Sequence, residues 1–554
     1  MPPPPCTPRH PAPTPADRPC PADRVRLTWA QPEDLLGHEL RQAAEDGRDP
    51  GPVQRAWSAA GGHPAPERAG ASPVPAPPHL RALAARLMDE LARLPSPLAA
   101  DEPTTWAAIA AACPTSGSPA PAAPLPSRPE HVGPGPAAAG AGPAREAHPH
   151  IGPARAPAAP TPETGPGPTA RSGAADGQQS ARAHTRTGPG PSGRDALVRA
   201  GGDGLRERLE AAWVGRAVGC LLGKPVEKLP LEGIRALARA TGNWPLGDWF
   251  TARGVPPELL AAHPWNRRSA PTSLAENIDG MPEDDDLNYP LLGLLLLQRH
   301  GKAFTTADVA RLWLDELPAG RTFTAERVAY RNLLLGLEPP TTATHHNPFR
   351  EWIGALIRAD VHGWTNPGDP AGAAAQAYRD AALTHTGNGV YAALFVAAAT
   401  AEAATGRADV HTALRTGLAA VPPRSRLAEA IRFGIRTAAG EADFDLVVDR
   451  LHARYGHHHW VHAVPNTALI AAALTHADGD FTRSVCRAVS GGWDTDSNGA
   501  TAGALAGLLA GSPDRIPHRW TAPLKNRLAT SVPGFDGIGF DTLAHLTAQE
   551  AARS

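Results

Sequence analysis

The chain has no aromatic residue from position 107 to position 212, although it contains 13 Trp, 10 Phe and 5 Tyr in all. Pro, Ala, Gly, Ser and Thr with scattered Arg make up most of this stretch. Such a composition buries too little apolar surface to offset the entropy cost of folding. We therefore expect residues 114–195 to form a flexible linker, and the Pro-rich residues 1–22 to be disordered for the same reason.

Cysteines are also scarce. The five cysteines form no C-x-x-C pair, which argues against a disulfide framework and a zinc ribbon. A formal net charge of −2 gives no general attraction to nucleic acid or to an anionic membrane. The longest apolar run, residues 389–399, is too short to span a bilayer. The first residues lack the pattern of a secretory signal, so we expect a cytoplasmic protein.

Helical periodicity dominates the rest of the chain. Residues 23–113 predict a small helical module, because Leu80, Leu83, Leu87 and Leu91 recur at helical spacing. Residues 196–554 predict a large all-α domain, since helical runs alternate with short Gly, Pro or Asn turns and strand signals are poor. The runs cover residues 206–222, 287–300, 306–317, 325–335, 370–383, 390–405, 409–420, 424–439, 444–455, 466–474, 480–489 and 498–510.

Two acidic segments indicate a metal site. Glu283-Asp284-Asp285-Asp286 precedes an apolar run, and Asp494-Thr495-Asp496-Ser497 precedes a stretch rich in Ala, Gly and Leu. One or two carboxylates can cap a helix, but four in a row repel one another and add no further capping. Neither segment contains Lys or Arg, and hard cations such as Mg²⁺ or Mn²⁺ prefer oxygen ligands. A fold that joins the segments would form a two-metal site able to activate water.

Glycines recur every fourth residue next to these segments. Such a series lines one helix face and permits close backbone approach, as in dimerising membrane helices. Here Arg216 and Lys224 flank a short apolar core, so we favour a tightly packed soluble interior that lets the acidic segments converge. The two series are Gly215, Gly219 and Gly223, and Gly499, Gly503, Gly507 and Gly511.

Three further polar groups have two interpretations each. His385 and Asn388 precede an apolar helix, where they either cap it or face a polar pocket. Asp360 lies in the segment 357–364, which either contacts a nucleotide or forms a structural Arg–Asp pair. The histidines at positions 457–459 and 462 lack the H-E-x-x-H pattern and the usual spacing of a zinc site, which favours a structural role.

The large domain resembles the ADP-ribosylglycohydrolase family (the dinitrogenase-reductase-activating glycohydrolase type) in three motifs that follow the family's order. Residues 215–227 are similar to its opening helix, G-x-x-x-G-D-A-x-G-x-P-x-E. Residues 283–286 take the place of its T-D-D-T motif, and residues 491–497 that of its G-G-D-x-D-T/S motif. The resemblance extends over roughly residues 205–511.

This resemblance implies an all-α fold with two divalent ions, Mg²⁺ or Mn²⁺. It also implies hydrolysis of the glycosidic bond that joins ADP-ribose to a protein side chain or a small acceptor. By position, Glu227 matches a glutamate at the family's metal and substrate site, and His385 lies in a segment that lines the family's pocket. We expect Glu227, Asp285 and Asp494 to be catalytic, and His385, Asn388, Asp360 and Trp493 to contact the substrate. The implied metal ligands are Glu283, Asp284, Asp285, Asp494, Asp496 and Ser497.

The chain departs from the family pattern at several positions. Glu283 and Asp286 stand where Thr is usual, Cys220 replaces the Asp of the opening helix, and Trp493 precedes Asp494. Every implied ligand still carries an oxygen, which favours an active enzyme over a silent ADP-ribose-binding module. A glycohydrolase of another ribosyl compound shares the same mechanism. A prenyl-diphosphate enzyme is disfavoured, because D-D-x-x-D is absent. The module of residues 23–113 would either recruit a partner or stabilise the large domain.

Overall fold

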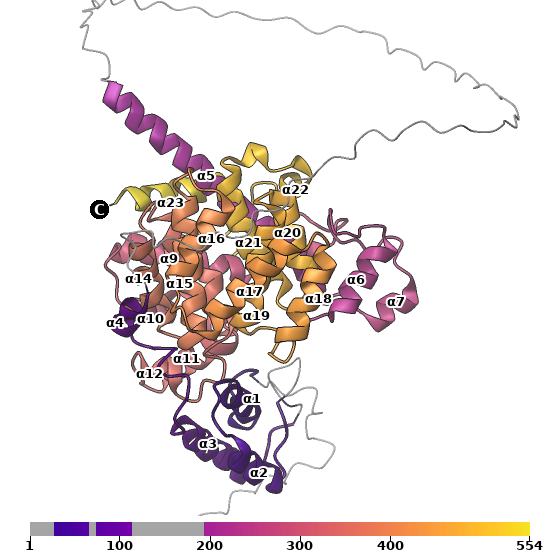
Figure 1. Cartoon of the computed structure of the whole chain (residues 1–554), viewed down its shortest axis with the longest axis vertical. Helices are drawn as coiled ribbons and strands as arrows, with labels where there is room; N and C mark the ends of the chain where they lie inside the picture. Colours follow the sequence, from indigo (N-terminus) through magenta and orange to yellow (C-terminus); the bar gives the residue numbers. More distant parts are fainter. Residues whose placement is uncertain (1–26, 66–71, 73, 114–192, 554) are drawn as a thin grey trace, which may run out of the picture. The chain divides into compact units, whose positions relative to one another are not determined.

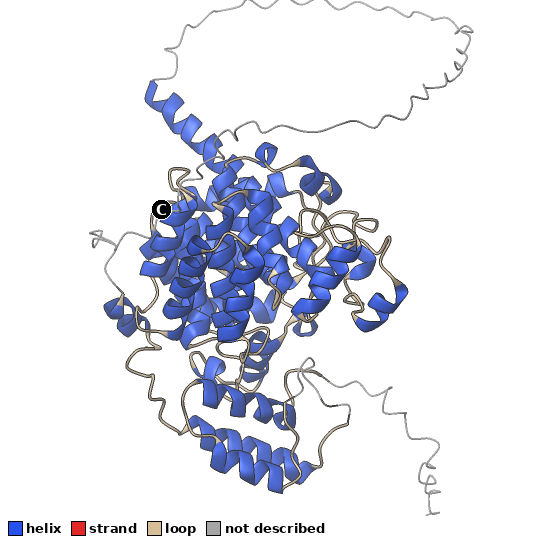
Figure 2. Ribbon diagram, turned by 45° about the vertical axis from the view of Figure 1, so that its right-hand side comes forward, coloured by secondary structure: helices blue, strands red, loops and turns tan. Residues whose placement is uncertain are grey.

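The computed structural model describes residues 27–65, 72, 74–113 and 193–553, and for residues 193–203 the backbone alone. Within these ranges every regular element is a helix (Figure 2), and the only extended pairings are three isolated bridges. The predicted all-α fold is confirmed. The expected disorder of residues 1–22 and most of the expected linker lie outside the described residues, and the domain boundaries stay a prediction.

The described part of the N-terminal module contains four helices: α1 (Pro32–Glu45), α2 (Gly51–Ala59), α3 (Pro78–Ala92) and α4 (Trp106–Ala112). Leu80, Leu87 and Leu91 of α3 are buried, as their spacing predicts. Trp57 is buried as well, and its indole N–H donates to the His63 carbonyl at 2.8 Å. These contacts explain why a short stretch with few aromatic residues packs at all.

The large domain begins with α5 (Gly193–Gly223). Its N-terminal half continues with α6 (Leu231–Ala240), α7 (Pro257–Ala262), α8 (Ala270–Ser273), α9 (Asp285–His300), α10 (Thr306–Glu316), α11 (Thr324–Leu334), α12 (Thr341–Thr344), α13 (Asp360–Trp364) and α14 (Pro370–Ala381). Its C-terminal half comprises α15 (Gly387–Ala403), α16 (Val410–Ala419), α17 (Arg426–Gly440), α18 (Phe444–Tyr455), α19 (Ala463–Ala477), α20 (Phe481–Ser490), α21 (Thr495–Ala510), α22 (His518–Thr521) and α23 (Phe540–Ala552).

Two of these helices form the centre of the domain. Nearly every residue of α15 and all of α19 are buried, because both sequences are apolar around the whole helix. Helices α14 and α16 pack against α15, while α17 and α20 pack against α19 (Figure 1). No described helix combines the length and the apolarity that crossing a bilayer requires.

The glycine series bring α5 and α21 into antiparallel backbone contact. Gly215 faces the Gly503 carbonyl, Gly219 faces the Gly499 carbonyl, and Gly223 faces the backbone of Thr495. A Cβ atom at any of these three glycines would lie closer to the opposite backbone than real Cβ atoms do. The predicted close approach is therefore confirmed, and it joins the end of α5 to the start of α21.

The N-terminal module contacts the large domain through buried ion pairs. Arg350 donates to Glu39 of α1 at 2.7 Å and to Asp46 at 2.8 Å. Arg426 pairs with Glu102 of the module at 2.7 Å and with Glu351 at 2.9 Å. These ion pairs neutralise charges that would be costly to bury alone. The N-terminal module and the large domain therefore both depend on this contact.

The histidines after α18 belong to the same interface. Glu45 Oε1 lies 3.4 Å from His458 Nδ1, and Glu45 Oε2 lies 3.4 Å from His462 Nε2. His462 Nδ1 accepts the amide N–H of Val464, so the ring proton is on Nε2 and points at the carboxylate. This tautomer suits an acceptor such as Glu45 and opposes a metal ion, in line with the structural role expected from the sequence.

Replacing Arg350 by methionine should destabilise this interface strongly. The change leaves Glu39 and Asp46 buried without a cationic partner, a loss that typically costs about 3–5 kcal/mol. Urea titration of the full-length variant measures the change in the free energy of unfolding. The matched control is Arg450→Met, because that arginine is 54% exposed and pairs with Glu441 at the surface, where such a pair contributes about 0–1 kcal/mol. Equal effects of the two substitutions would show that the buried pair does not stabilise the protein.

Mild acid should loosen α1 from the large domain. Burial and the nearby Arg41 lower the pKa of His38 to about 3, and burial lowers the pKa of His458 to about 4 although Glu45 opposes the shift. Both rings are therefore neutral when docked and gain protons below about pH 6.5 once released, so docking is weakened by falling pH. At pH 5 we expect a loss of about 2 kcal/mol for each histidine.

Hydrogen exchange of the α1 amides, corrected for intrinsic rates, measures this loosening. His38 lies among the rings of Trp29, Phe349 and Trp352, and a phenylalanine fits these surroundings. His38→Phe should therefore abolish about half of the pH dependence. Protection of α1 that is constant from pH 7 to pH 5 would contradict the prediction.

Candidate metal centre

The two acidic segments meet at the end of α5. The Thr495 hydroxyl donates to the Gly223 carbonyl at 2.8 Å, and the ammonium of the next residue, Lys224, pairs with Asp284. One short stretch of backbone thus contacts the second segment through Gly223 and the first through Lys224. The convergence expected from the sequence is confirmed, although its geometry depends on a lysine that belongs to neither segment.

The second segment forms the buried start of α21. Asp494 is the N-cap residue and is 6% exposed, and Asp496 is 7% exposed. The amide N–H of Asp494 donates to Asn466 Oδ1 at 3.1 Å, and the same oxygen accepts Asn498 Nδ2 at 2.7 Å. Asn466 therefore holds the backbone of the segment. The Asp494 and Asp496 carboxylates contact each other, and Asp496 Oδ1 also accepts the Ser497 N–H at 3.2 Å.

The first segment forms the N-terminus of α9, and cations from elsewhere in the chain pair with three of its carboxylates. Glu283 pairs with Arg321 at 2.8 Å. Asp284 caps α9 and pairs with Lys224, and Asp286 pairs with Arg216 at 3.3 Å. Asp285 makes no ion pair with any described residue. The segment itself contains no Lys or Arg, so its sequence did not reveal that cations from elsewhere in the chain pair with three of its four carboxylates.

Burial leaves the remaining carboxylates short of positive charge. Burial together with the Glu227 and Asp284 carboxylates raises the pKa of Asp496 to about 7. Burial and Asp496 raise the pKa of Asp494 well above its usual range, and burial with Asp284 and Asp496 does the same to Asp285. Because a divalent cation would stabilise the ionised forms of all three, the donor set fits a hard metal ion.

Glu227 lies beside these carboxylates. Its Oε2 accepts a hydrogen bond from Asn266 Nδ2 at 2.6 Å, and its Oε1 pairs with Lys228 at 2.7 Å. Its charge contributes to the raised pKa values of both Asp494 and Asp496. The side chain remains 16% exposed, so it borders the centre from the solvent side.

His385 and Asn388 are held by other contacts. The Asn388 amide group donates to Glu351 Oε1 at 2.9 Å and accepts the Leu427 N–H at 2.9 Å. His385 is buried, its Nδ1 bonds to the Thr384 hydroxyl at 2.6 Å, and burial lowers its pKa well below the usual value. None of these contacts reaches the acidic segments.

Asp360 and Trp493 also have protein partners. Asp360 is fully buried and pairs with Arg216, the arginine that also contacts Asp286. Burial raises the pKa of Asp360 to about 6, against the opposing effect of Arg216. Trp493, at a φ of 55°, stacks on His452 at a ring distance of 3.8 Å. The Arg–Asp pair left open by the sequence exists, with Arg216 in place of Arg358.

Three residues with a structural part in this centre were not assigned to it from the sequence. Arg216 and Lys224 were recognisable as isolated charges on a helix of small and apolar residues, where burial demands a partner of opposite charge. The sequence gave no reason to assign Asn466 to the centre, because a single Asn in an apolar helix can form many kinds of hydrogen bond. Each acts on residues far away in the chain, which single-sequence patterns do not reveal.

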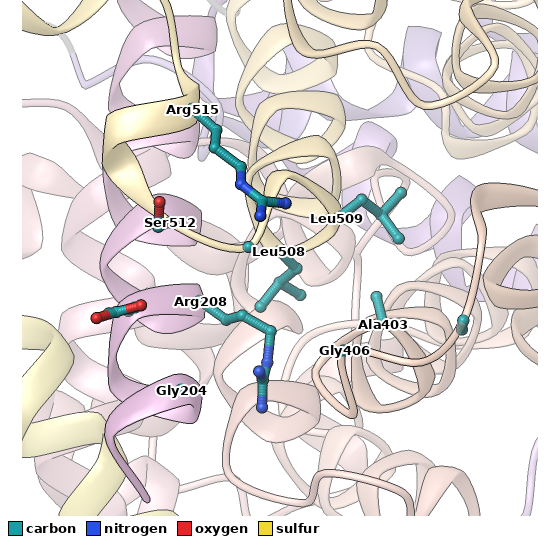
Figure 3. Close-up of a pocket in the computed structure, with 11 residues that line it drawn as sticks. Gly204, Arg208, Ala403, Gly406, Leu508, Leu509, Ser512 and Arg515 are labelled. Atoms are coloured by element: carbon teal, nitrogen blue, oxygen red, sulfur yellow. The ribbon is translucent and has the colours of Figure 1, made fainter. Parts of the chain in front are cut away.

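A pocket of about 290 Å³ lies near the opposite end of the α5–α21 pair. Figure 3 shows Arg208 and Arg515 at this pocket, together with Leu508, Leu509 and Ser512. None of the implied metal ligands lines it. It is therefore separate from the acidic centre.

The large domain is all-helical, and its buried acidic centre lies where the glycine-lined helices α5 and α21 cross. This combination of fold and site is typical of one class of protein. The sequence profile of the ADP-ribosylglycohydrolase family matches residues 202–551, and the chain belongs to this family. Among solved structures, an ADP-ribosylglycohydrolase-related protein complex is similar, with 21% identity over 63% of this chain and 98% of that chain and a TM-score of 0.38. No curated protein matches the chain.

Proposed function

We propose that the protein is a metal-dependent ADP-ribosylglycohydrolase, which hydrolyses the bond between ADP-ribose and a protein side chain or a small acceptor. Family membership supports a glycosyl hydrolase of this type. The observation that carries the proposal is the meeting of Asp285, Asp494 and Asp496, three carboxylates whose pKa values burial raises. Such a cluster is costly for stability alone and therefore points to function.

The residues that would hold Mg²⁺ or Mn²⁺ are those of the two acidic segments, Glu283, Asp284, Asp285, Asp494, Asp496 and Ser497. A bound divalent ion supplies Lewis acidity and lowers the pKa of water. The carboxylates of the chain orient the ribose hydroxyls and balance the positive charge. Burial of Asp494 and Asp496 excludes bulk water and strengthens these electrostatic effects.

Glu227 is our candidate for orienting or deprotonating the attacking water. Its Asn266 and Lys228 contacts fix the carboxylate at the solvent side of the centre. Attack on the anomeric carbon then passes through an oxocarbenium-like transition state, as in other glycoside hydrolyses.

The substrate contacts implied for His385, Asn388, Asp360 and Trp493 stay a prediction. Stacking on His452 gives Trp493 a fixed ring plane close to Asp494, which favours a role in positioning a substrate group. The contacts of Asn388 and Asp360 favour a structural role for these two residues.

Release of free ADP-ribose tests the proposal. The substrates are arginine-linked, serine-linked and small-molecule ADP-ribosyl compounds, each with Mg²⁺, with Mn²⁺ and with EDTA. Metal-dependent release that EDTA abolishes would support the hydrolase and identify the linkage. Binding of ADP-ribose without release would favour a silent binding module. Neither release nor binding would favour a different ribosyl substrate.

The buried ion pairs of the N-terminal module favour a stabilising role for residues 27–113. Recruitment of an ADP-ribosylated protein remains the second hypothesis. Removing residues 1–113 separates the two, because a stabilising module predicts a lower unfolding temperature and slower turnover of every substrate. A recruiting module predicts slower turnover of protein substrates alone. We also propose a cytoplasmic location, which suits the free thiols of Cys113, Cys220 and Cys486.

A further inference from the structure

We propose that the cavity lined by Arg208 and Arg515 binds a small organic phosphate monoester, with these two arginines as the partners of the phosphate group. The cavity lies near the end of the α5–α21 pair that is opposite the acidic centre, and none of the implied metal ligands lines it. Binding there is therefore independent of the proposed function and of any metal ion.

Arg208 is fixed at the edge of the cavity by the end of a helix. Its Nε donates to the carbonyl of Ala404, the C-cap residue of α15, at 3.0 Å, and carbonyls at a helix C-terminus favour a cation. This contact uses only one of the N–H donors of the guanidinium group. The terminal nitrogens, Nη1 and Nη2, form no hydrogen bond or ion pair with a described residue. Capping of α15 thus explains the position of Arg208 and leaves its other donors free for a ligand.

These unused donors distinguish Arg208 from other arginines in similar surroundings. Burial lowers the pKa of Arg208, against the effect of Glu207 and together with that of Arg407. Burial also lowers the pKa of Arg327 and of Arg331, but each of these donates through a terminal nitrogen to an oxygen of the protein, at 2.8 and 3.2 Å respectively. Because arginine keeps its charge in proteins, a partly buried guanidinium without such partners is stabilised by an anionic ligand.

Arg515 provides the second cation. Its Nη1 donates to the carbonyl of Ala510, the last residue of α21, at 3.3 Å, and it pairs with no carboxylate in the described part of the chain. Figure 3 shows Arg208 and Arg515 on either side of Leu508, at the same cavity. Since the side chain of Arg515 is exposed and flexible, its guanidinium can approach a ligand that Arg208 holds. The Ser512 hydroxyl, which also lines the cavity, offers a further donor.

Two glycines keep the guanidinium of Arg208 accessible. A Cβ atom at Gly406 would lie 2.8 Å from Arg208 Nη1, and one at Gly204 would lie 3.4 Å from the same nitrogen. Both glycines line the cavity. The absence of side chains at these positions therefore leaves space beside Nη1, where an oxyanion would bind.

The charge and the size of the cavity indicate the class of ligand. Arg208 and Arg515 line it with one carboxylate, Glu207, among the described lining residues, so positive charge is in excess. A phosphate monoester carries about −1.5 to −2 charges at pH 7, and its oxygens match the planar donor fork of arginine. The cavity volume of about 290 Å³ lies at the small end of the range for organic ligands, roughly 300–1,000 Å³. The organic part would contact the apolar lining residues, which are Ala403, Ala408, Leu508 and Leu509.

Calorimetric titration of the full-length protein with ribose 5-phosphate tests the proposal. EDTA is present throughout, so that no metal ion at the acidic centre can bind the phosphate. We expect one molecule per chain, weaker binding of inorganic phosphate and of succinate, and no binding of ribose. Arg208→Met and Arg515→Met should each lower the affinity about tenfold or more, as the loss of a hydrogen bond to a charged group does. The matched control is Arg450→Met, which removes a 54% exposed arginine outside the cavity and should leave the affinity unchanged.

Absence of saturable binding to the wild type would overturn the proposal, as would an unchanged affinity in both Arg208→Met and Arg515→Met. Inorganic phosphate that binds as tightly as ribose 5-phosphate would overturn the organic ligand, and succinate that binds more tightly would overturn the phosphate. Arg208→Lys keeps the charge and should retain part of the affinity, which separates a lost ligand contact from misfolding. Arginine-dependent binding by a protein that releases no ADP-ribose would uphold this site and refute the proposed function alone.

Discussion

Replacing Asp494 by alanine should lower kcat/KM for ADP-ribose release by about a thousandfold, which corresponds to ~4 kcal/mol of transition-state stabilisation. Asp494 is the buried N-cap residue of α21 and lies against Asp496. Its loss removes a metal ligand and changes the charge that balances the ion. Steady-state kinetics at saturating Mn²⁺ and at saturating Mg²⁺ measure the effect.

The matched control for this prediction is Asp514→Ala, an exposed aspartate outside the centre, which should leave kcat/KM unchanged. Asp494→Asn provides a second readout in the metal-free protein. Because burial raises the pKa of Asp494, its ionised form opposes folding at neutral pH. The Asn variant without metal should therefore be at least as stable as the wild type. Activity within tenfold of the wild type would contradict the assignment of Asp494.

Replacing Gly219 by alanine should destabilise the large domain by about 3 kcal/mol, because the new methyl group has no space. Its Cβ would meet the Gly499 carbonyl and the Ala500 amide, both of them backbone atoms that only a shift of α21 could move. That shift would also displace the start of α21, so Mn²⁺ affinity should fall together with stability. Urea titration and calorimetry with Mn²⁺ measure the two effects.

Gly440→Ala is the matched control for this substitution. Gly440 is the last residue of α17, and a Cβ atom there meets nothing within 4 Å. Since alanine favours helix more than glycine does, this variant should gain up to about 1 kcal/mol. A Gly219→Ala protein as stable as the wild type would show that α5 and α21 can separate without cost.

Local patterns of the sequence predicted the fold well. The two glycine series, the apolar runs of α15 and α19, and the acidic starts of α9 and α21 each have a short-range signature, and each was found at the expected place within a few residues. Seven helices of the large domain were missed, namely the longer α6 and α23 and the short α7, α8, α12, α13 and α22. The apolar positions of α6, which include Ile234 and Leu237, do follow a helical period, so that omission was avoidable.

Only the carboxylates of the candidate site could be predicted from the sequence. The cations that pair with them, Arg216, Lys224 and Arg321, come from three separate elements, and the sequence gives no pairing between charges so far apart. The contacts of Arg350 with Glu39 and Asp46 escaped prediction for the same reason. From the sequence, His385 and Asn388 could equally well cap α15 or face a pocket. The contacts that hold the start of α15 come from residues distant in the chain, so the sequence could not decide between the two roles.

The crossing of α5 and α21 also has a consequence for synthesis of the protein on the ribosome. The contact between Gly223 and Thr495 joins residues 272 positions apart, so α5 is made long before its partner. At typical translation rates of 5–20 residues per second the interval is roughly 15–55 s. During this time the glycine face of α5 lacks the α21 backbone that covers it in the folded domain, whereas Asp286 and Asp360, the partners of Arg216, are made well before α21.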